Sequence, residues 1–347
     1  ELFNANYAYF SSFSTTWLAH AERYVADMTA RFKLNTQSLV VEVAANDGYL
    51  LQYVKGRGIP CLGIEPTAST AAAARAKGIE IIEDFFGIRL ARELIKQGKQ
   101  ADLAVANNVL AHVPDINDFV SGFAGLLKPD GVATFEFPHL LRLVAGSQFD
   151  TIYHEHFSYL SLHAVNQIFE HNGLSVFDVE ELPTHGGSLR VYAQRRAAGQ
   201  HKAAGHVAGL LERESAAGMT APEYYAGFQP KADKIKNDLM AFLIKAKSEG
   251  KQVAAYGAAA KGSTLLNYAG VRPDLLAYVV DRNPDKQGKY LPGSRIPIVT
   301  EAYLIDKHPD YVMILPWNLC EEVTNQLAFI RKWGGRFVTA VPTLEVI

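Results

Sequence analysis

Cysteine is nearly absent from this chain, with two among 347 residues. Cys61 and Cys320 are too few for a disulfide framework or a cysteine-ligated zinc site, so we expect two buried thiols without a redox role. An excess of charge of one sign is also missing, because 34 Lys and Arg residues stand against 36 Asp and Glu residues. Nucleic acid and anionic membrane surfaces are therefore not expected partners.

Long apolar runs are missing as well. No segment reaches the roughly 18 apolar residues that a membrane span requires. The first residues, ELFNANYAYFSSFSTTW, lack the basic start and continuous apolar stretch of a signal peptide. These absences predict a cytoplasmic protein whose partners are small molecules. The hydrophobic content of 48% and the chain length suffice for two domains with full cores.

Strand and helix patterns alternate through the first half of the chain. The expected strands lie at 38–44, 60–66, 79–84, 103–109 and 131–137, and helical patterns between them include 67–78 and 115–128. A helix over 163–173 and two strands, 174–182 and 188–196, complete this half. The pattern predicts an α/β domain with a mainly parallel sheet covered on both faces. Five alternating units followed by a hairpin are typical of a class I methyltransferase sheet.

The second half begins with a different composition. Residues 197–252 are rich in Ala, Gly, Lys and Glu and contain a long helical pattern. A strand, glycine turn and helix then follow at 251–270, with further strand patterns to the end of the chain. We expect an N-terminal arm at 1–19, the first domain at 20–197, and a helical connector with a second Rossmann-like α/β domain at 198–347.

The turn after the first strand is a candidate cofactor site. The strand ends at Glu42, and a turn through Ala44, Asn46 and Gly48 lets the backbone approach a ligand at the carboxyl edge of the sheet. Glu65 ends the next strand, from which a carboxylate can accept both hydroxyls of a ribose. The turn lacks the GxGxxG spacing, which disfavours a pyrophosphate. It favours a nucleoside without one, such as S-adenosylmethionine.

Two further turns add polar groups to the same edge. Asp84 and Phe85 can place an acid and an aromatic ring beside an adenine. Asn107, Asn108 and His112 follow the fourth strand. Each group also occurs in ordinary loops, so it is their order along the chain that favours a nucleoside site.

A dense polar cluster follows, formed by Tyr153, His154, Glu155 and His156. A phenol, two imidazoles and a carboxylate suit proton abstraction next to a carbonyl, provided that they face one cavity. A solvated helix start or a hydrogen-bonded histidine network is the plainer alternative. His154 and His156 share one side only if this stretch is extended. A metal pair formed by these two rings is disfavoured, because no third ligand follows at a regular spacing, and no metal site is expected.

The glycine turn of the second domain contains Gly257, Lys261, Gly262 and Ser263. Its amides and ammonium suit a diphosphate at a helix N-terminus, although Lys261 precedes Gly262 and the pattern is not a Walker A loop. Asp281 ends the next strand, in the position of the ribose-binding acid of dinucleotide folds, which makes NAD an alternative ligand. Lys286 is a further candidate contact for a diphosphate.

Combined, these motifs resemble the C-methyltransferases of nucleotide-linked deoxysugars over essentially the whole chain. The motifs are VEVAANDGYLL, GIEP, NNVLAHV, YHEHFSYLS, HGGSLRV, YGAAAKGSTLLNYAG, DRNPDKQGKYLPG and LPWN. The resemblance implies S-adenosylmethionine as methyl donor and S-adenosylhomocysteine as product. It also implies methyl transfer to a sugar carbon adjacent to a ketone, commonly C3 of a dTDP- or GDP-linked 4-keto-6-deoxy sugar.

The family typically carries an N-terminal zinc-binding module that has no counterpart in this sequence. There is no cysteine cluster, and NANYAYFSS resembles the segment just after that module. The chain is thus expected to be truncated or naturally shortened, and zinc is expected only if a missing module exists. Ala44 stands where related methyltransferases often have Gly, and it is small enough for cofactor binding to survive.

The resemblance also suggests roles for the polar groups. His156 is the first choice for the base that generates an enolate, and Tyr153 would donate to the enolate oxygen. Glu155 would tune a histidine, His112 would approach from the cofactor side, and Tyr7 matches the family's N-terminal active-site tyrosine. The spacing alone does not decide which imidazole is the base.

Substrate contacts are expected from both halves of the chain. His185 lies in a glycine turn with unusual backbone angles, and Ser188 and Arg190 after it are expected to contact the sugar or phosphate. The second domain is expected to hold the nucleotide through its glycine turn. Two alternatives from other classes stay open, namely a non-catalytic nucleotide-sugar-binding protein and an NAD-dependent keto-sugar oxidoreductase.

Overall fold

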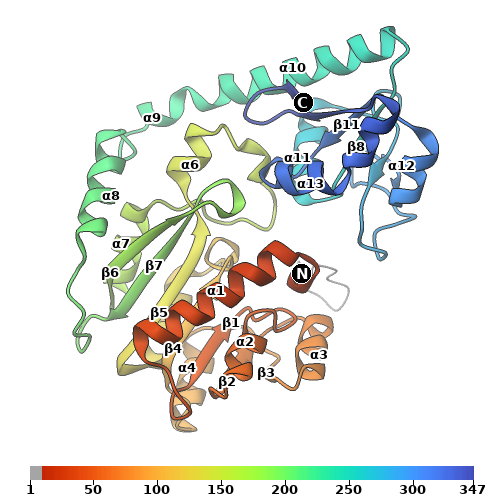
Figure 1. Ribbon diagram of the computed structural model, residues 1–347. Coiled ribbons are helices and arrows are strands. Elements are labelled where there is room, and N and C mark those ends of the chain that lie inside the picture. Colours follow the sequence, from red (N-terminus) through yellow and green to blue (C-terminus); the bar gives the residue numbers. More distant parts are fainter. Residues whose placement is uncertain (1–9) are drawn as a thin grey trace. The chain divides into compact units, whose positions relative to one another are not determined.

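The computed structural model of the chain describes residues 10–347 (Figure 1). The chain divides into two compact units. Unit 1 runs to His139 and also contains Glu155–Pro183 and Gly187–Ala216, and unit 2 contains Leu140–His154, Thr184–Gly186 and Ala217–Ile347. The expected boundary at residue 19 coincides with no break in secondary structure, because helix α1 runs from Thr15 to Phe32. The domain boundaries expected from the sequence stay a prediction.

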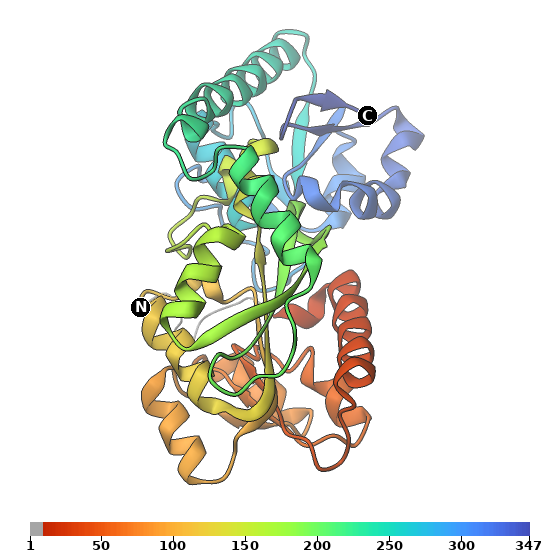
Figure 2. The same cartoon turned by 90° about the vertical axis from the view of Figure 1, so that its left-hand side faces the viewer.

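Unit 1 contains a seven-stranded sheet in the order β3-β2-β1-β4-β5-β7-β6. Its strands are β1 (Val40–Val43), β2 (Cys61–Ile64), β3 (Glu80–Ile82), β4 (Ala101–Asn107), β5 (Leu127–Pro138), β6 (Leu174–Leu182) and β7 (Ser188–Arg195). The first five strands pair in parallel, whereas β7 pairs antiparallel with both β5 and β6 (Figure 2). This is the strand order of a class I methyltransferase, and it confirms the expected fold class.

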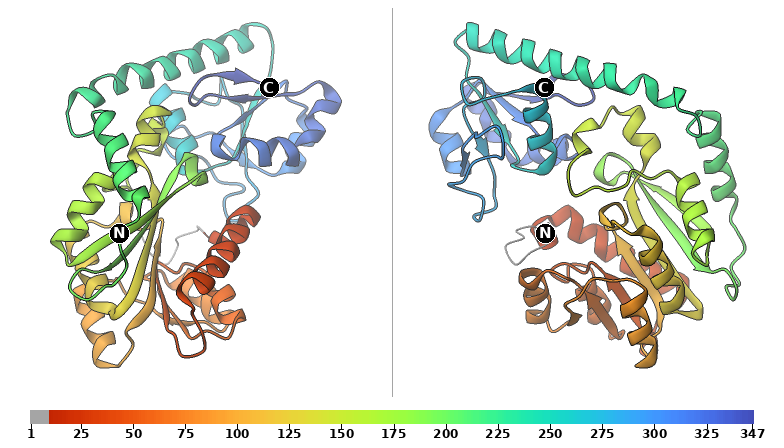
Figure 3. Two further views of the ribbon diagram at one scale, coloured as in Figure 1. Left: turned by 60° about the vertical axis from the view of Figure 1, so that its left-hand side comes forward. Right: turned by 180° about the vertical axis from the view of Figure 1, so that it is seen from behind.

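Helices cover both faces of this sheet, as Figure 3 shows. One face packs against α1 (Thr15–Phe32), α2 (Leu51–Gly56) and α3 (Ala68–Ala76). The other packs against α4 (Ile88–Lys96), α5 (Ile116–Leu126), α7 (Leu162–His171) and α8 (Gly205–Ala216). Parallel strands are buried on both sides by their crossover helices, which explains the nearly continuous apolar runs of β1 and β4. The carboxyl ends of these strands therefore form the edge where a ligand can bind.

Unit 2 contains a second sheet in the order β10-β9-β8-β11-β12-β13. Its strands are β8 (Val253–Tyr256), β9 (Val279–Val280), β10 (Ile298–Val299), β11 (Tyr311–Ile314), β12 (Arg336–Thr339) and β13 (Glu345–Val346). All pairs are parallel except β12 with β13. Among the further strand patterns expected in this half, the apolar run 275–283 is wrong in length as a strand, because only Val279 and Val280 of it are in β9.

The second sheet is also covered on both faces. One apolar cluster includes α10 (Phe228–Ser248) and α11 (Ala260–Ala269), and the other includes α12 (Glu301–Lys307) and α13 (Cys320–Gln326). The remaining helices of this unit are α6 (Leu140–Ala145) and α9 (Glu223–Ala226). The result confirms a second Rossmann-like α/β fold. No helix within residues 10–347 is long and apolar enough to cross a membrane, and the cytoplasmic location stays a prediction.

A buried ion-pair network links the strands of unit 1. Glu136 on β5 lies opposite Arg190 on β7, and Arg190 Nη2 donates to Glu136 Oε2 over 3.0 Å. His20 Nε2 lies 2.9 Å from the same oxygen, and Arg190 Nη1 donates to Glu180 over 3.2 Å. The guanidinium also lies 4.7 Å from the ring centre of Tyr24. Burial alone raises the pKa of Glu136, but His20 and Arg190 together bring that pKa below its usual range.

Removing the arginine of this network is expected to destabilise the fold strongly. An Arg190→Met variant leaves the fully buried Glu136 carboxylate without its cation, which costs about 3–5 kcal/mol of unfolding free energy. Because the folded-state pKa of Glu136 is lowered, its contribution in the wild type is present above about pH 4.3 and is lost as the pH falls further. Urea unfolding across this pH range measures both effects. The exposed Arg196→Met variant is the control, and equal stability of the two variants would contradict the expectation.

Candidate active site

The turn after β1 has the backbone of a ligand-binding loop. Ala44, Asn46 and Gly48 have φ of 58°, 49° and 74°, in the left-handed region that glycine adopts most readily. A side chain at Gly48 would meet Ile79 Cδ1 at 2.4 Å and Ala74 Cβ at 3.2 Å and would have to adopt the left-handed backbone, so glycine is favoured there. Ala44 thus adopts a backbone conformation that costs a side-chain-bearing residue more than it costs glycine. The sequence indicated this turn correctly.

Glu65 fixes the shape of the turn. Its carboxylate, at the end of β2, accepts hydrogen bonds from the Asn46 amide and from the Thr67 amide, both over 2.9 Å. The side chain is 5% exposed. A carboxylate with two further lone pairs beside this turn can still receive ribose hydroxyls. The structure thus brings Glu65 and Asn46 together, as expected.

Two buried polar groups at this edge have unused hydrogen-bonding capacity. Both carboxylate oxygens of Glu42 and Oδ1 of Asn107 have no hydrogen-bond partner of normal geometry among the described residues. Burial raises the pKa of Glu42 well above its usual range, the Tyr49 side chain lowers it, and the charges of Asp47 and Glu65 raise it further. Unsatisfied buried groups next to a left-handed turn fit a nucleoside ligand.

The turn after β3 presents an aromatic ring. Phe85 is 64% exposed, and the Asp84 carboxylate pairs with Arg89 and accepts from the Phe85 amide. An exposed ring fits the expected stacking position beside a purine, whereas the acid is engaged with a neighbouring cation.

Residues before α1 also contact the cofactor turn, which the sequence did not reveal. The Ser11 amide donates to Asn46 Oδ1 over 2.9 Å, and the Ser12 amide donates to Asp47 over 3.3 Å. Lys77 donates to the Ser12 hydroxyl over 2.8 Å. These contacts tether the segment that follows Tyr7, which itself lies outside the described residues.

Aromatic stacking continues from this turn onto α1. Trp17 stacks on Tyr49 with ring centres 5.8 Å apart and on His20 at 4.8 Å. The i, i+3 spacing of Trp17 and His20 on one helix was the signal that could have indicated this stack.

The polar groups after β4 and in the later cluster meet in unit 1. The rings of His112 and His156 are 4.8 Å apart and nearly perpendicular, and His156 lies 5.7 Å from the Tyr159 ring. Burial lowers the pKa of His112, while a hydrogen bond with the Glu155 backbone raises it. Burial also raises the pKa of the Glu155 carboxyl. A histidine pair with a carboxyl nearby can exchange protons with a substrate.

The extended conformation that would align His154 with His156 is not present. His154 and Glu155 form a turn, and His154 is exposed whereas His156 is half-buried. The boundary between the units passes between His154 and Glu155, so Tyr153 belongs to unit 2. Among residues 10–347 no group of three or more His, Cys, Asp or Glu side chains could hold a metal ion.

The hairpin after β6 has the unusual backbone angles expected from the sequence. Its Arg190 side chain, however, lies in the protein interior. His185 has φ 54° within the Thr184–Gly186 turn, and Ser188 begins β7 with 1% exposure. Arg190 is buried in the ion pairs with Glu136 and Glu180. These contacts give Arg190 a structural role, and its expected contact with substrate stays a prediction.

The glycine turn of unit 2 repeats the geometry of the first. Asp281, after β9, accepts from the Ala258 amide over 2.8 Å, just as Glu65 accepts from Asn46. Gly257 has φ 93°, and a side chain there would meet Pro316 at 2.5 Å. Lys286 donates to the Ala258 carbonyl over 2.9 Å and lies 3.4 Å from Asp281. A strand-end acid on a turn amide suits a nucleoside in this unit as well.

Lys261, close to Ser263 in sequence, lies in a partly buried polar cluster of the same unit. Its ammonium donates to Asn318 over 2.8 Å and lies 4.5 Å from the ring centre of Trp317. Burial lowers the pKa of Lys261 to about 8, and the charge of Asp150 acts against this. Burial raises the pKa of Asp150 to about 6, while Lys261 and the Trp317 N–H, which donates over 2.7 Å, lower it. Asp150 was not among the residues predicted from the sequence, although it lies only three residues before Tyr153.

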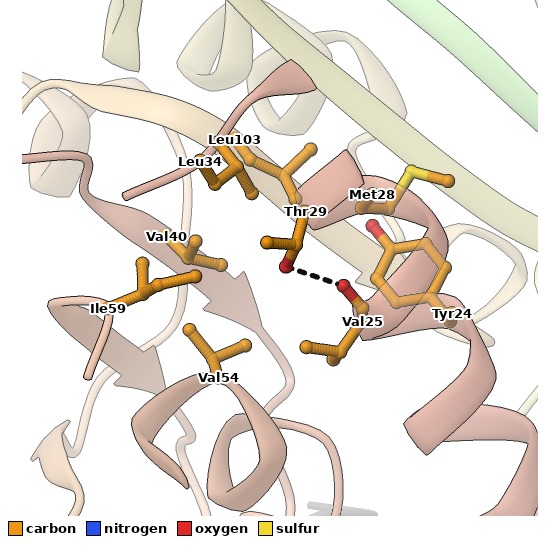
Figure 4. Close-up of a pocket in the computed structure, with 9 residues that line it drawn as sticks. All are labelled: Tyr24, Val25, Met28, Thr29, Leu34, Val40, Val54, Ile59 and Leu103. Atoms are coloured by element: carbon orange, nitrogen blue, oxygen red, sulfur yellow. Dashed lines mark hydrogen bonds between the residues drawn. The ribbon is translucent and has the colours of Figure 1, made fainter. Parts of the chain in front are cut away.

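A small apolar pocket lies between α1 and β1 in unit 1 (Figure 4). It is lined by Tyr24, Val25, Met28, Thr29, Leu34, Val40, Val54, Ile59 and Leu103. The Tyr24 and Thr29 hydroxyls already form hydrogen bonds with the Thr134 hydroxyl and the Val25 carbonyl. The pocket is a packing gap in the core.

The two cysteine thiols are less buried than expected. Cys61 and Cys320 are half-buried, and burial raises the pKa of both.

The strand order gives unit 1 the fold of a class I methyltransferase. The sequence pattern of a methyltransferase domain matches residues 17–179, and that of a C-methyltransferase C-terminal domain matches residues 183–342. The chain is 35% identical to C-methyltransferase NovU of Streptomyces niveus, over 99% of this chain and 81% of that protein. It belongs to the S-adenosylmethionine-dependent C-methyltransferase family.

Three further similar proteins cover about a third to a half of this chain. A ubiquinone biosynthesis O-methyltransferase of Rhodopseudomonas palustris is 28% identical over 31% of this chain and 46% of its own. The PH0226 protein of Pyrococcus horikoshii OT3 aligns with a TM-score of 0.45 at 15% identity, over 54% of this chain and 95% of that one. Magnesium protoporphyrin IX methyltransferase of Synechocystis with bound SAM aligns with a TM-score of 0.40 at 17% identity, over 51% and 79%. The fold assignment rests on the strand order described above.

Proposed function

We propose that this C-methyltransferase methylates a sugar carbon adjacent to a ketone in a nucleoside-diphosphate 4-keto-6-deoxy sugar, with C3 as the expected carbon. The pair of rings formed by His112 and His156 is the observation that carries the proposal. His112 ends the short helix Leu110–His112 that follows β4, so the pair lies at the carboxyl edge of the sheet, where the cofactor turn also lies.

The chemistry of such a sugar explains why proton-transfer groups belong at this edge. Carbon next to a ketone becomes nucleophilic only after losing a proton, so a base and a stabilised oxyanion are required. We propose that the imidazole of His156 removes the proton from this carbon. The Tyr153 hydroxyl would donate a hydrogen bond to the ketone oxygen. The pKa of His112 is lowered by burial, which favours a neutral ring there and avoids a second positive charge beside His156. S-adenosylmethionine, when bound, supplies the electrophilic methyl group.

Residues Glu42, Ala44, Asn46, Gly48, Glu65 and Asn107 are the proposed cofactor contacts. Two observations support this assignment. Glu65 accepts hydrogen bonds from two backbone amides, and both buried side-chain oxygens of Glu42 have no hydrogen-bond partner of normal geometry among the described residues. Phe85 is proposed to stack on the adenine. Asp84 is proposed to help order this turn through its bond to the Phe85 amide.

Unit 2 is proposed to hold the nucleotide of the sugar. The turn at Gly257, the strand-end acid Asp281 and the cations Lys261 and Lys286 support it, since a ribose and a diphosphate need these groups. Ser263 in the first turn of α11 is a further candidate contact. NAD would use the same acid, and this alternative is an outcome of the test below.

The test is mass spectrometry of dTDP- and GDP-linked 4-keto-6-deoxy sugars incubated with S-adenosylmethionine in deuterated water. We expect one sugar to gain a methyl group, placed on carbon by fragmentation, and to exchange its α-proton even when the methyl donor is omitted. Methylation on oxygen, or exchange without any enzyme dependence, would overturn the proposed chemistry. A change in nicotinamide absorbance on adding NADH and keto sugar would favour an oxidoreductase.

Nucleotide binding by unit 2 is expected to depend on the charge of Lys261. With a pKa of about 8, the Lys261 amine is largely protonated at neutral pH and loses its positive charge at higher pH. Wild-type affinity for dTDP should fall as the pH rises through about 8, and Lys261→Met should weaken binding about tenfold at neutral pH and show no such pH dependence. Calorimetric titration measures this. Lys289→Met, at an exposed position, should behave as wild type, and a Lys261→Met affinity equal to it would contradict the assignment.

A further inference from the structure

A second histidine–carboxylate pair lies in unit 1, away from the catalytic groups assigned above. His139 Nε2 donates to Glu214 Oε1 over 2.7 Å, and both side chains are completely inaccessible to solvent. His139 follows the end of β5, and Glu214 lies on α8. Burying a carboxylate is costly unless it is well hydrogen bonded, so such a pair calls for an explanation.

Glu214 also caps the helix that follows the catalytic loop. The Leu162 amide donates to Oε1 over 2.7 Å and the His163 amide to Oε2 over 2.8 Å, while the Ser161 hydroxyl accepts from the Ala164 amide. The first three amides of α7 are thereby satisfied by side chains, two of them by one charge at the positive end of the helix. Glu214 therefore fixes where α7 begins.

The start of α7 is the return point of the loop that carries His156. Leu160 forms a backbone bridge with His139. Phe157 and Ser158 donate to the Ala111 carbonyl, next to His112, over 2.8 and 3.3 Å. The segment from Glu155 to Ser161 thus has one anchor beside His112 and a second anchor at the His139–Glu214 pair.

Glu214 comes from outside the part of the chain that matches a general methyltransferase domain. That match ends at residue 179, whereas α8 lies within the match to the C-methyltransferase C-terminal domain. Helix α8 nevertheless packs in the core of unit 1 through Val207 and Leu210. Helix α8 therefore reaches the start of α7 through one buried carboxylate.

We propose that Glu214, with His139 as its partner, is a positioning residue that holds the His156 ring against His112 by clamping the return of the catalytic loop. This inference rests on the proposed function for the part His156 plays. It makes α8 part of the active-site framework, in addition to its place on the path to unit 2.

The test compares Glu214→Gln with Glu212→Gln, an exposed position on the same helix. Three measurements are made on the full chain: S-adenosylmethionine affinity by calorimetry, α-proton exchange of dTDP-4-keto-6-deoxyglucose, and the ring ¹H–¹³C signals of His112 and His156, assigned with a His156→Gln variant. Glu214→Gln is expected to slow exchange by about tenfold to hundredfold and to shift or broaden both ring signals, while cofactor affinity stays unchanged. His139→Gln, which keeps a donor, should retain most of the exchange rate, whereas His139→Leu should behave like Glu214→Gln.

Two results would overturn the positioning role. One is an equal loss of cofactor affinity and exchange, which is the mark of a general loss of structure. The other is unchanged ring signals in Glu214→Gln. If the wild type catalyses no exchange with any panel sugar, the proposed function fails, and the ring signals alone still decide whether Glu214 positions the His156 ring.

Discussion

A His156→Ala variant is expected to lose about 10³-fold or more of its methyl-transfer rate while it binds S-adenosylmethionine with nearly wild-type affinity. The reason is that the imidazole acts on the substrate's proton, whereas the proposed cofactor contacts lie on the turns after β1 and β2. The centre of the half-buried ring lies 4.8 Å from that of His112, and neither residue belongs to those turns. Single-turnover methyl transfer and α-proton exchange measure the loss, and calorimetry measures cofactor binding.

The chain offers a close control for this variant. His154 lies two residues away in the same turn region, and its side chain is exposed. His154→Ala should keep most of the activity. If it is as damaging as His156→Ala, or if exchange persists in His156→Ala, the base has been assigned to the wrong imidazole.

The second large effect is expected at Glu65, where Glu65→Ala should weaken S-adenosylmethionine binding about tenfold to hundredfold. The carboxylate holds the amides of Asn46 and Thr67 and is proposed to receive the ribose hydroxyls, so its loss removes contacts to the ligand and relaxes the turn. At saturating cofactor the methyl-transfer rate should recover substantially. Equilibrium binding and the concentration dependence of the rate together measure this.

Glu83→Ala is the matched control for Glu65→Ala. Glu83 follows β3 at an exposed position and pairs with Arg75 at the surface. It should leave cofactor affinity unchanged. Equal losses of affinity and of saturated rate in Glu65→Ala would mean that the acid supports the whole fold and not the cofactor turn in particular.

The strands and turns of unit 1 followed from local patterns. Apolar runs such as the one ending at Glu42, small residues at Ala44 and Gly48, and acids at strand ends are encoded within short windows, because each describes one strand and its own turn. The hairpin around His185 was equally readable from its glycines. Such features depend on neighbours in sequence, and the structure confirmed them.

The side-chain partnerships were not readable in the same way. Arg190 looked like a substrate contact because it follows a glycine turn, yet the pairing of β5 with β7 places it opposite Glu136 in the core. Asp150 meets Trp317, 167 residues away. Partners this distant are set by the sheet register and helix packing, which no local pattern contains.

By itself, the sequence determined the class of this protein. Short stretches of consecutive residues indicate two open α/β sheets. They also indicate a turn after the first strand that lacks the GxGxxG spacing, and a cluster of groups that can transfer protons. Only the tertiary structure decided that the ring of His156, and not that of His154, lies against His112. It also decided that Glu214, on a helix distant in sequence, binds the amides at the start of α7. The reason is physical. The direction of the His154 side chain and the hydrogen bonds of a buried carboxylate depend on the groups packed around them, and those groups come from distant parts of the chain.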